Sequence, residues 1–304
     1  MPLKITRASE PIKVEQITVC LYAPPGLGKT ATASTAEGPL LLDFDNGAHR
    51  TAFRSDAVRV DSWREVARIS PQDLEPYRTV VVDTVGRALD YLASELISQD
   101  RRNSNRSGGL SLQGYGALKS TFSGWLRQLH VAGKDVVLIA HMDEQKRGDD
   151  VLERLDVQGS SKNELYKSAD VMGRLAIGNE GGFGGRLLAF SPTDTAFGKD
   201  PAGLGTVPVP SFDEQPRFLA ELMAGVKDCL NADSAAAQDL ARQRAEFRDL
   251  PATADAFSTK AAELSDADPA VKRALVEVAE EMGLVFDRQA KAFTGQAGQA
   301  EAAA

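Results

Sequence analysis

The chain alternates short apolar runs with stretches in which apolar residues recur every three or four positions. The apolar runs have the length and composition of buried strands, and they cover residues 16–22, 39–43, 57–60, 79–83 and 135–141. The stretches with helical spacing lie between them, at residues 62–69, 86–99 and 115–131. Strands that alternate with helices form mainly parallel sheets with helices on both faces. The pattern therefore predicts an α/β fold.

The pattern changes after this alternating part. Two further strands, at residues 171–177 and 186–190, are separated by the turn sequence GNEGGFGG, and residues 218–230 have the spacing of a closing helix. From residue 231 onward Ala, Gln and charged residues dominate, with helical segments before and after Pro251, and the last residues have nothing to bury. We therefore expect a core domain at 1–230, an acidic helical extension at 231–292 and a disordered tail at 293–304.

Composition limits the class of protein. The chain has 304 residues, of which 42% are hydrophobic, and no apolar run reaches the roughly 20 residues that span a bilayer. Its first residues lack the apolar segment of a secretory signal, and Cys20 and Cys229 suffice for neither a disulfide framework nor a metal cluster. We therefore expect a soluble, cytoplasmic protein with no membrane partner.

Charge is distributed unevenly along the chain. The net charge is −8, and residues 232–304 hold 13 acidic and 8 basic residues, so much of the acidity lies there. Residues 101–134 contain no Asp or Glu but carry six Lys and Arg. This basic segment is where we look for a contact with nucleic acid.

The sequence APPGLGKT follows the apolar run ITVCLY and fits the phosphate-binding loop (P-loop) pattern G-x-x-x-x-G-K-[ST], except that Ala stands at the first position. In such a loop backbone N–H groups surround phosphate oxygens, the lysine contacts the β- and γ-phosphates, and the hydroxyl ligates Mg²⁺. The sequence therefore predicts that ATP and Mg²⁺ bind here. The expected nucleotide-binding residues are Ala23, Pro24, Pro25, Gly26, Leu27, Gly28, Lys29 and Thr30, with Lys29 also catalytic.

A second nucleotide motif is the run TVVVDT at residues 79–84. A buried strand that ends in a carboxylate beside a P-loop is a Walker B strand, and its aspartate holds Mg²⁺ through water. We therefore assign Asp83, with Thr30, to the metal. The alternative, that Asp83 caps the following helix, is less favourable because Thr84 is the better cap.

The order of these motifs resembles that of RecA-like ATPases and, more narrowly, of phage nucleotide-binding proteins of the Sak-type single-strand annealing group. RecA proteins have F-I-D-A-E-H where this chain has LLDFDN at residues 41–46, and V-V-D-S-V where it has VVDTV at 81–85. The resemblance implies a RecA-like P-loop NTPase core with a mainly parallel sheet. It also implies that Asp45 polarises the attacking water and that His141, at the end of VVLIAH, senses the γ-phosphate.

RecA-like proteins bind single-stranded DNA with two mobile loops, which by resemblance fall at residues 98–116 and 142–165. The first loop is basic, and arginines neutralise phosphates while a tyrosine stacks on bases. The alternative is that both are solvated loops. The expected DNA-binding residues are Arg101, Arg102, Arg106, Tyr115, Lys146 and Arg147.

The sequence FGKDPAGLG at residues 197–205 resembles the element with which DnaB-type helicases insert a lysine and an arginine into the ATP site of a neighbouring subunit. Lys199 matches the lysine, which would make it catalytic, whereas Pro201 replaces the arginine. The alternative is an exposed lysine in a Gly/Pro loop.

Together these features predict an ATP-binding and ATP-hydrolysing phage recombination protein of the bacterial host cytoplasm. It would bind single-stranded DNA, form a homo-oligomeric ring or filament and promote annealing, and its acidic extension would compete with DNA or recruit a single-strand-binding protein. A replicative helicase-like motor or loader is the main alternative. A small-molecule kinase and a nucleotide-gated scaffold that does not hydrolyse ATP are further alternatives.

Overall fold

The computed structural model describes residues 10, 12–51, 53–148, 150–157, 161–178 and 185–295. The chain divides into two compact units. The core unit is Val14–Leu230, and the C-terminal unit combines the chain from Asn231 onward with the residues before Val14. Each unit has its own hydrophobic core.

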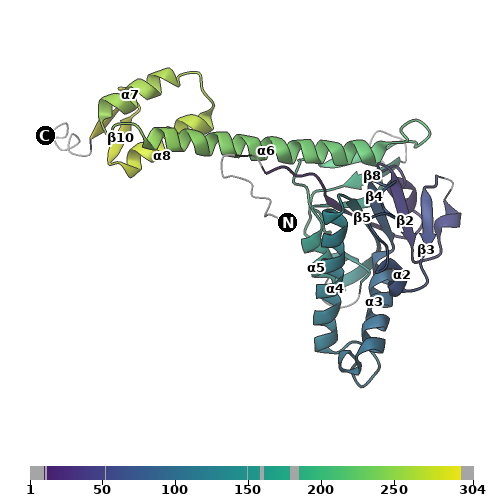
Figure 1. The fold of residues 1–304 in the computed structure, drawn as a ribbon. Helices are drawn as coiled ribbons and strands as arrows, with labels where there is room; N and C mark the ends of the chain where they lie inside the picture. Colours follow the sequence, from purple (N-terminus) through teal and green to yellow (C-terminus); the bar gives the residue numbers. More distant parts are fainter. Residues whose placement is uncertain are drawn as a thin grey trace. The chain divides into compact units, whose positions relative to one another are not determined.

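The core unit is built on a nine-stranded sheet with the order β3-β2-β4-β5-β1-β7-β8-β9, in which β6 also pairs with β5 (Figure 1). The strands from β3 to β7 in this order run parallel, whereas β8, β9 and β6 are antiparallel to their neighbours. The strands are β1 (Thr18–Ala23), β2 (Pro39–Asp43), β3 (Asp56–Arg59), β4 (Thr79–Asp83), β5 (Asp135–Arg147), β6 (Asp150–Leu155), β7 (Val171–Gly178), β8 (Gly185–Ala189) and β9 (Thr206–Val209).

Helices cover both faces of this sheet because alternate residues of each buried strand face opposite sides. Val80 and Val82 pack in one apolar cluster with residues of α3 and α4, whereas Val81 packs in the other with α1 and the start of α6. The helices are α1 (Lys29–Ala33), α2 (Trp63–Val66), α3 (Val85–Gln99), α4 (Leu112–Val131), α5 (Ser161–Ser168) and α6 (Phe218–Arg248), with 3₁₀ turns η1 (Ala48–Arg50) and η2 (Arg101–Asn103). The predicted RecA-like α/β fold is confirmed. Within the ranges that the structure describes, no helix has the length and apolar character to span a membrane.

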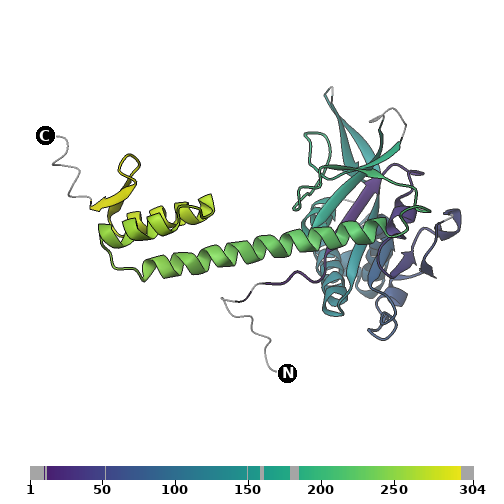
Figure 2. The same cartoon turned by 90° about the horizontal axis from the view of Figure 1, so that it is seen from above.

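The segment after His141, expected to be a mobile loop at residues 142–165, is instead a β-hairpin followed by α5. Strand β5 continues to Arg147 and pairs with β6 from Met142↔Leu155 to Arg147↔Asp150. Leu152 and Leu155 are buried, which anchors one side of the hairpin. Figure 2 shows this strand pair, in teal, projecting beyond the rest of the sheet.

The segment expected to be a mobile loop at residues 98–116 is also mostly regular structure. Helices α3 and α4 run side by side and are joined at the bottom of Figure 1 by a short tip. The Asp100 side chain accepts a hydrogen bond from the backbone N–H of Arg102 and so caps η2, and Ser111 caps α4 through the N–H of Gly114. Within the pair formed by α3 and α4, only Asp100 and residues 104–111 lie outside the helices and η2, because these caps continue helical structure almost to the tip.

The C-terminal unit contains more than the helices predicted for it. Helix α6 is continuous to Arg248, where two helices, 218–230 and 234–248, were predicted. It is followed by α7 (Ala254–Glu263), α8 (Pro269–Glu281) and an antiparallel pair, β10 (Leu284–Asp287) and β11 (Ala292–Gly295). Disorder was expected from residue 293, but Phe293 is buried, with its ring centroid 4.9 Å from Phe286 and 5.6 Å from Phe257. The rest of the expected tail, 296–304, lies outside the described residues.

A buried ion pair ties the start of β5 to α6 within the core unit. The Asp135 carboxylate is almost fully buried and accepts hydrogen bonds from the Ile17 backbone N–H at 2.9 Å and the Lys227 Nζ at 2.6 Å. Arg78 Nε lies 3.4 Å from the same carboxylate. Removing one member of such a group leaves the other charge without compensation.

Asp135→Ala is therefore expected to destabilise the core unit by about 3–5 kcal/mol. The measurement is urea unfolding followed by fluorescence of Trp63 and Trp125, which both lie in the core unit. Asp61→Ala is the control, because Asp61 forms an exposed pair with Arg59 and should cost less than about 1 kcal/mol. Equal losses for the two variants would contradict the role given to Asp135.

Candidate nucleotide site

The P-loop lies at the carboxyl edge of the sheet, between β1 and α1. Ala23 is the last residue of β1, and helix α1 begins at Lys29. Between them Gly26 and Gly28 have φ of +84° and +86°, a region that glycine enters without steric cost. The two glycines thus permit the sharp path from strand to helix that the sequence motif predicts.

Lys29 is buried against the loop that carries it. Its Nζ donates hydrogen bonds to the carbonyl oxygens of Ala23 and Pro24, both at 2.9 Å. Burial lowers the pKa of Lys29, whereas the negative charges of Asp83 and Asp45 act in the opposite direction. The ammonium group is therefore held at the phosphate loop, where phosphate oxygens are stronger acceptors than the two carbonyls.

Thr30 and Asp83 form the candidate magnesium site. The Thr30 hydroxyl donates to Asp83 Oδ2 at 2.6 Å, which brings the P-loop and the end of β4 into direct contact. Burial raises the pKa of Asp83, and the Asp45 and Asp43 charges raise it further against the effects of Thr30 and Lys29. A hydroxyl and a carboxylate are oxygen ligands that suit Mg²⁺, so these residues fit the ion. When bound, Mg²⁺ would neutralise negative charge on the nucleotide phosphates.

A turn after β2 positions Asp45. The buried carboxylate of Asp43 accepts hydrogen bonds from the backbone N–H groups of Gly47 and Ala48, each at 2.9 Å, and so closes the turn. The Phe44 N–H donates to the Asp83 carbonyl at 2.7 Å, which fixes the turn to β4. Asp43 therefore acts on the backbone, and Asp45 is the carboxylate that faces the open site.

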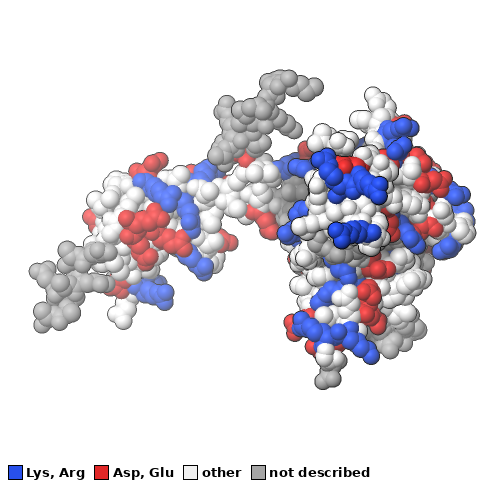
Figure 3. Space-filling model, turned by 90° about the horizontal axis from the view of Figure 1, so that it is seen from below, with Lys and Arg blue, Asp and Glu red and all other residues white. Residues whose placement is uncertain are grey.

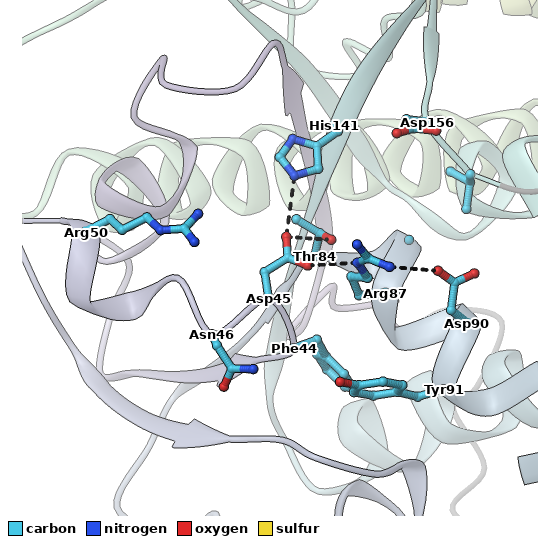
Figure 4. Close-up of a pocket in the computed structure, with 12 residues that line it drawn as sticks. Phe44, Asp45, Asn46, Arg50, Thr84, Arg87, Asp90, Tyr91, His141 and Asp156 are labelled. Atoms are coloured by element: carbon cyan, nitrogen blue, oxygen red, sulfur yellow. Dashed lines mark hydrogen bonds and ion pairs between the residues drawn. The ribbon is translucent and has the colours of Figure 1, made fainter. Parts of the chain in front are cut away.

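Asp45 contacts three side chains: Thr84, which lies between β4 and α3, Arg87 of α3 and His141 of β5 (Figure 4). Thr84 Oγ1 donates to Asp45 Oδ2 at 3.2 Å, His141 Nε2 lies 3.4 Å from the same oxygen, and Arg87 Nε lies 3.4 Å from Oδ1. The bond from His141 is the main cause of the lowered pKa of Asp45, and Thr84 and Arg87 lower it further against the effect of burial. Thr84 was expected to cap α3, but its hydroxyl makes no capping bond because it is directed to Asp45.

A cavity of about 660 Å³ opens beside this cluster. Its lining includes Asp45, Asn46, Arg50, Arg87 and His141 (Figure 4). Two buried atoms in this lining, Asn46 Oδ1 and His141 Nδ1, have no hydrogen-bond partner among the described residues. Buried polar atoms normally have partners, so the cavity is suited to a polar ligand or ordered water. Arg50 and Arg87 were not predicted from the sequence, although Arg87 lies one turn beyond the Walker B motif.

The structure does not bring Lys199 to the P-loop of its own chain. Lys199 Nζ donates to the Ala169 carbonyl at 2.5 Å and lies 5.8 Å from the centroid of the Tyr166 ring. Insertion into a neighbouring subunit would require these contacts to break. Lys199 therefore has an internal structural partner that the sequence pattern did not indicate.

The residues expected to bind DNA lie on two separate elements. Arg101, Arg102 and Arg106 are exposed on the tip between α3 and α4, where Arg102 Nη2 is 2.8 Å from Asp100. Lys146 and Arg147 are exposed at the end of β5. Tyr115 was expected on a loop, but it belongs to α4. Its side chain is half-buried against the apolar core, so its ring is less accessible to a base than it would be on an exposed loop.

Comparison with known proteins identifies the family of this chain. Residues 15–202 match the family model described as AAA domain. The chain belongs to this family. The AAA domain includes the P-loop, Asp45, Asp83 and His141, and it indicates a P-loop ATPase with the RecA-like arrangement described above.

The other comparisons concern individual proteins. No curated protein matches this chain. A solved structure to which it is similar is a KaiC-like protein of the hyperthermophilic archaeon Pyrococcus horikoshii OT3, at 12% sequence identity and a TM-score of 0.37. The match covers 66% of this chain and 99% of the archaeal chain.

Lys29→Met is expected to weaken ATP binding by about 100-fold or more, because it removes the cation and keeps the buried aliphatic stem. Titration with a fluorescent ATP analogue measures the affinity. Lys134→Met is the matched control, since Lys134 is also buried and also donates to a backbone carbonyl, that of Tyr77 at 2.6 Å. Wild-type affinity in Lys29→Met would exclude this loop as the phosphate site.

Asp45→Asn is expected to leave ATP affinity largely unchanged and to slow hydrolysis by about 100-fold, because only the attacking water loses its polarising carboxylate. Steady-state phosphate release and nucleotide titration separate the two effects. Asp90→Asn makes the same change in charge within the same cavity and serves as the control. If both variants hydrolyse ATP at the wild-type rate, another residue activates the water.

Proposed function

We propose that this chain is an ATP-dependent recombination protein of the phage Sak-type single-strand annealing group. In this proposal it binds ATP with Mg²⁺ at the P-loop, binds single-stranded DNA and promotes annealing of complementary strands. The P-loop and Walker B motif of an AAA domain support the nucleotide part. The order of the RecA-like motifs supports the narrower group.

One observation carries the DNA part: helix α3 connects the nucleotide site with the basic tip. Its first turn contributes Arg87, which lies 3.4 Å from Asp45, and its last residue, Gln99, is followed by the exposed arginines of η2. A helix of 15 residues is about 22 Å long. A strand bound at the tip would therefore act on the same helix that holds the carboxylate of the ATP site.

The chemistry of the tip suits a phosphate backbone. Arg101 and Arg106 are exposed, and the exposed side chain of Arg102 pairs with the half-buried carboxylate of Asp100, a surface pair of low stability in water. Figure 3 shows the core unit from the side of this tip, where basic side chains are prominent and acidic ones lie among them. Contacts of this kind bind strands without sequence preference.

The proposal also includes assembly in the cytoplasm of a bacterial host cell. A homo-oligomeric ring or filament would place several tips along one DNA strand, and multivalent contact raises the overall affinity. A single-strand-binding protein is a further proposed partner, through the acidic C-terminal unit. A helicase-like motor is less favoured, because Pro201 replaces the arginine of the motor element and Lys199 is bound internally.

Changing Arg101, Arg102 and Arg106 together to Ala is expected to weaken single-strand binding for all sequences alike, because the lost contacts are to phosphates. The slope of log affinity against log salt should fall by up to about 0.7 for each lost contact. Fluorescence anisotropy at several salt concentrations measures both quantities. Stimulation of ATP hydrolysis by single-stranded DNA, and annealing of complementary oligonucleotides, should fall in parallel.

The matched control changes Arg59, Arg64 and Arg68 to Ala, three exposed arginines of the same unit away from the tip. This control loses the same net charge and should retain most of the affinity and the salt slope. A wild-type slope in the tip variant would refute the tip as the DNA site. ATP turnover that requires a small acceptor molecule instead of DNA would indicate a kinase.

A further inference from the structure

A second cation lies against the P-loop, and it comes from β8, which is separated from β1 by one strand, β7. Arg186 is on β8, which joins the parallel part of the sheet through β7. Its guanidinium group reaches Gly28: a methyl group built on the Gly28 Cα would stand only 2.5 Å from Arg186 Nη1. The positive φ of Gly28, +86°, favours glycine at this position, and the short distance shows how closely the Arg186 side chain approaches the loop.

An aromatic side chain holds the guanidinium group in place. The Arg186 Cζ lies 4.9 Å from the centroid of the Phe212 ring. Phe212 is itself buried, with its ring centroid 5.6 Å from Phe53 and 6.4 Å from Phe218. A cation stacked on a fixed ring keeps its N–H donors free at the edge of its plane.

Arg186 has no anionic partner within the part of the chain that the structure describes. It forms no ion pair and no hydrogen bond with another described side chain, whereas Arg174, on the neighbouring strand β7, is paired with Glu153. An arginine is charged at all physiological pH values, and a half-buried guanidinium group without a counter-ion is costly. Beside a P-loop, the natural counter-ion is the nucleotide phosphate.

We infer that Arg186 is a phosphate-binding residue of the nucleotide site that acts from the same chain as the P-loop. Gly28 belongs to the backbone that surrounds the α- and β-phosphates, whereas Lys29 reaches the β- and γ-phosphates. Arg186 therefore contacts the phosphates shared by nucleoside diphosphates and triphosphates. This inference rests on the proposed nucleotide site and adds to it a cation that lies outside the P-loop and Walker B motifs.

The role differs from the one that the sequence suggested for Lys199. The amine of Lys199 is bound to a carbonyl of its own chain, and the residue would act only in a neighbouring subunit. Arg186 is already at the P-loop of its own chain. Its contribution should therefore be present in the isolated subunit and should not depend on protein concentration.

The test measures binding of a fluorescent ADP, and its displacement by a non-hydrolysable ATP analogue and by magnesium tripolyphosphate. Arg186→Gln is expected to weaken all three by a similar factor of about tenfold or more, and Arg186→Lys by less, because the charge is retained. Tripolyphosphate has no base, so an undiminished affinity for it in Arg186→Gln would overturn the assignment to phosphate. A second result would also overturn the assignment: Arg186→Gln and Arg186→Lys lose affinity by the same factor, and both lose the same amount of thermal stability in the absence of nucleotide. Such a result would indicate a structural role.

Arg154→Gln is the matched control. Arg154 also lies over a phenyl ring, with Cζ 4.7 Å from the Phe197 centroid, and it donates to the Thr195 carbonyl, away from the P-loop. Its loss should leave nucleotide affinity unchanged. If the wild-type chain binds nucleotide and Lys29→Met does not, wild-type affinity in Arg186→Gln refutes the role of Arg186 alone. If the wild-type chain binds no nucleotide, the proposed function itself fails.

Discussion

The candidate site depends on the register of four neighbouring parallel strands. Asp83 of β4 is paired with Asp43 of β2 and with Ile139 of β5, and Ala23 of β1 is paired with His141. Parallel strands end at the same edge of a sheet, so the loops that follow all four strands meet there. A shift of β4 by one residue would turn Asp83 to the opposite face and separate it from Thr30. The apolar clusters on both faces oppose this shift, because it would also move every buried valine side chain of β4 to the opposite face of the sheet.

The same register concentrates buried charge, and each group is stabilised in a different way. Asp43 is surrounded by backbone N–H groups, and Lys29 is bound to two backbone carbonyls. Among the residues that the structure describes, the Asp83 carboxylate accepts a hydrogen bond from the Thr30 hydroxyl alone, and its pKa is raised by burial and by the nearby Asp45 and Asp43. Carboxylates so close together are stabilised by a cation. The charges of the site therefore favour binding of a divalent ion together with the phosphates that it accompanies.

The fold was predictable from the sequence to the extent that its signals are local. Strands β1 to β5, β7 and β8 contain short apolar runs, and the P-loop is a contiguous motif, so these were identified from the residues alone, whereas β6 and β9 were not. The helices α3 and α4 were predicted, but the segment that joins them, residues 98–116, and the β5–β6 hairpin were expected to be loops. The caps at Asp100 and Ser111 and the pairing of β5 with β6 depend on local side chains and on tertiary contacts, which override loop-like composition.

The partners of the site residues were harder to predict than the residues themselves. Asp45, Asp83 and His141 follow from motif order, and the structure brings them to one edge. Arg186 is distant from the P-loop in the sequence and belongs to an antiparallel addition to the sheet, so only the folded chain shows that it approaches Gly28.

Arg87 is another partner that the folded chain reveals, and it acts on Asp45. It and His141 lower the pKa of Asp45, which makes this carboxylate a weaker base. Because Arg87 belongs to α3, a small movement of that helix would change the charge around Asp45. In the function proposed above, this is how a DNA strand bound at the far end of α3 would change the rate of hydrolysis.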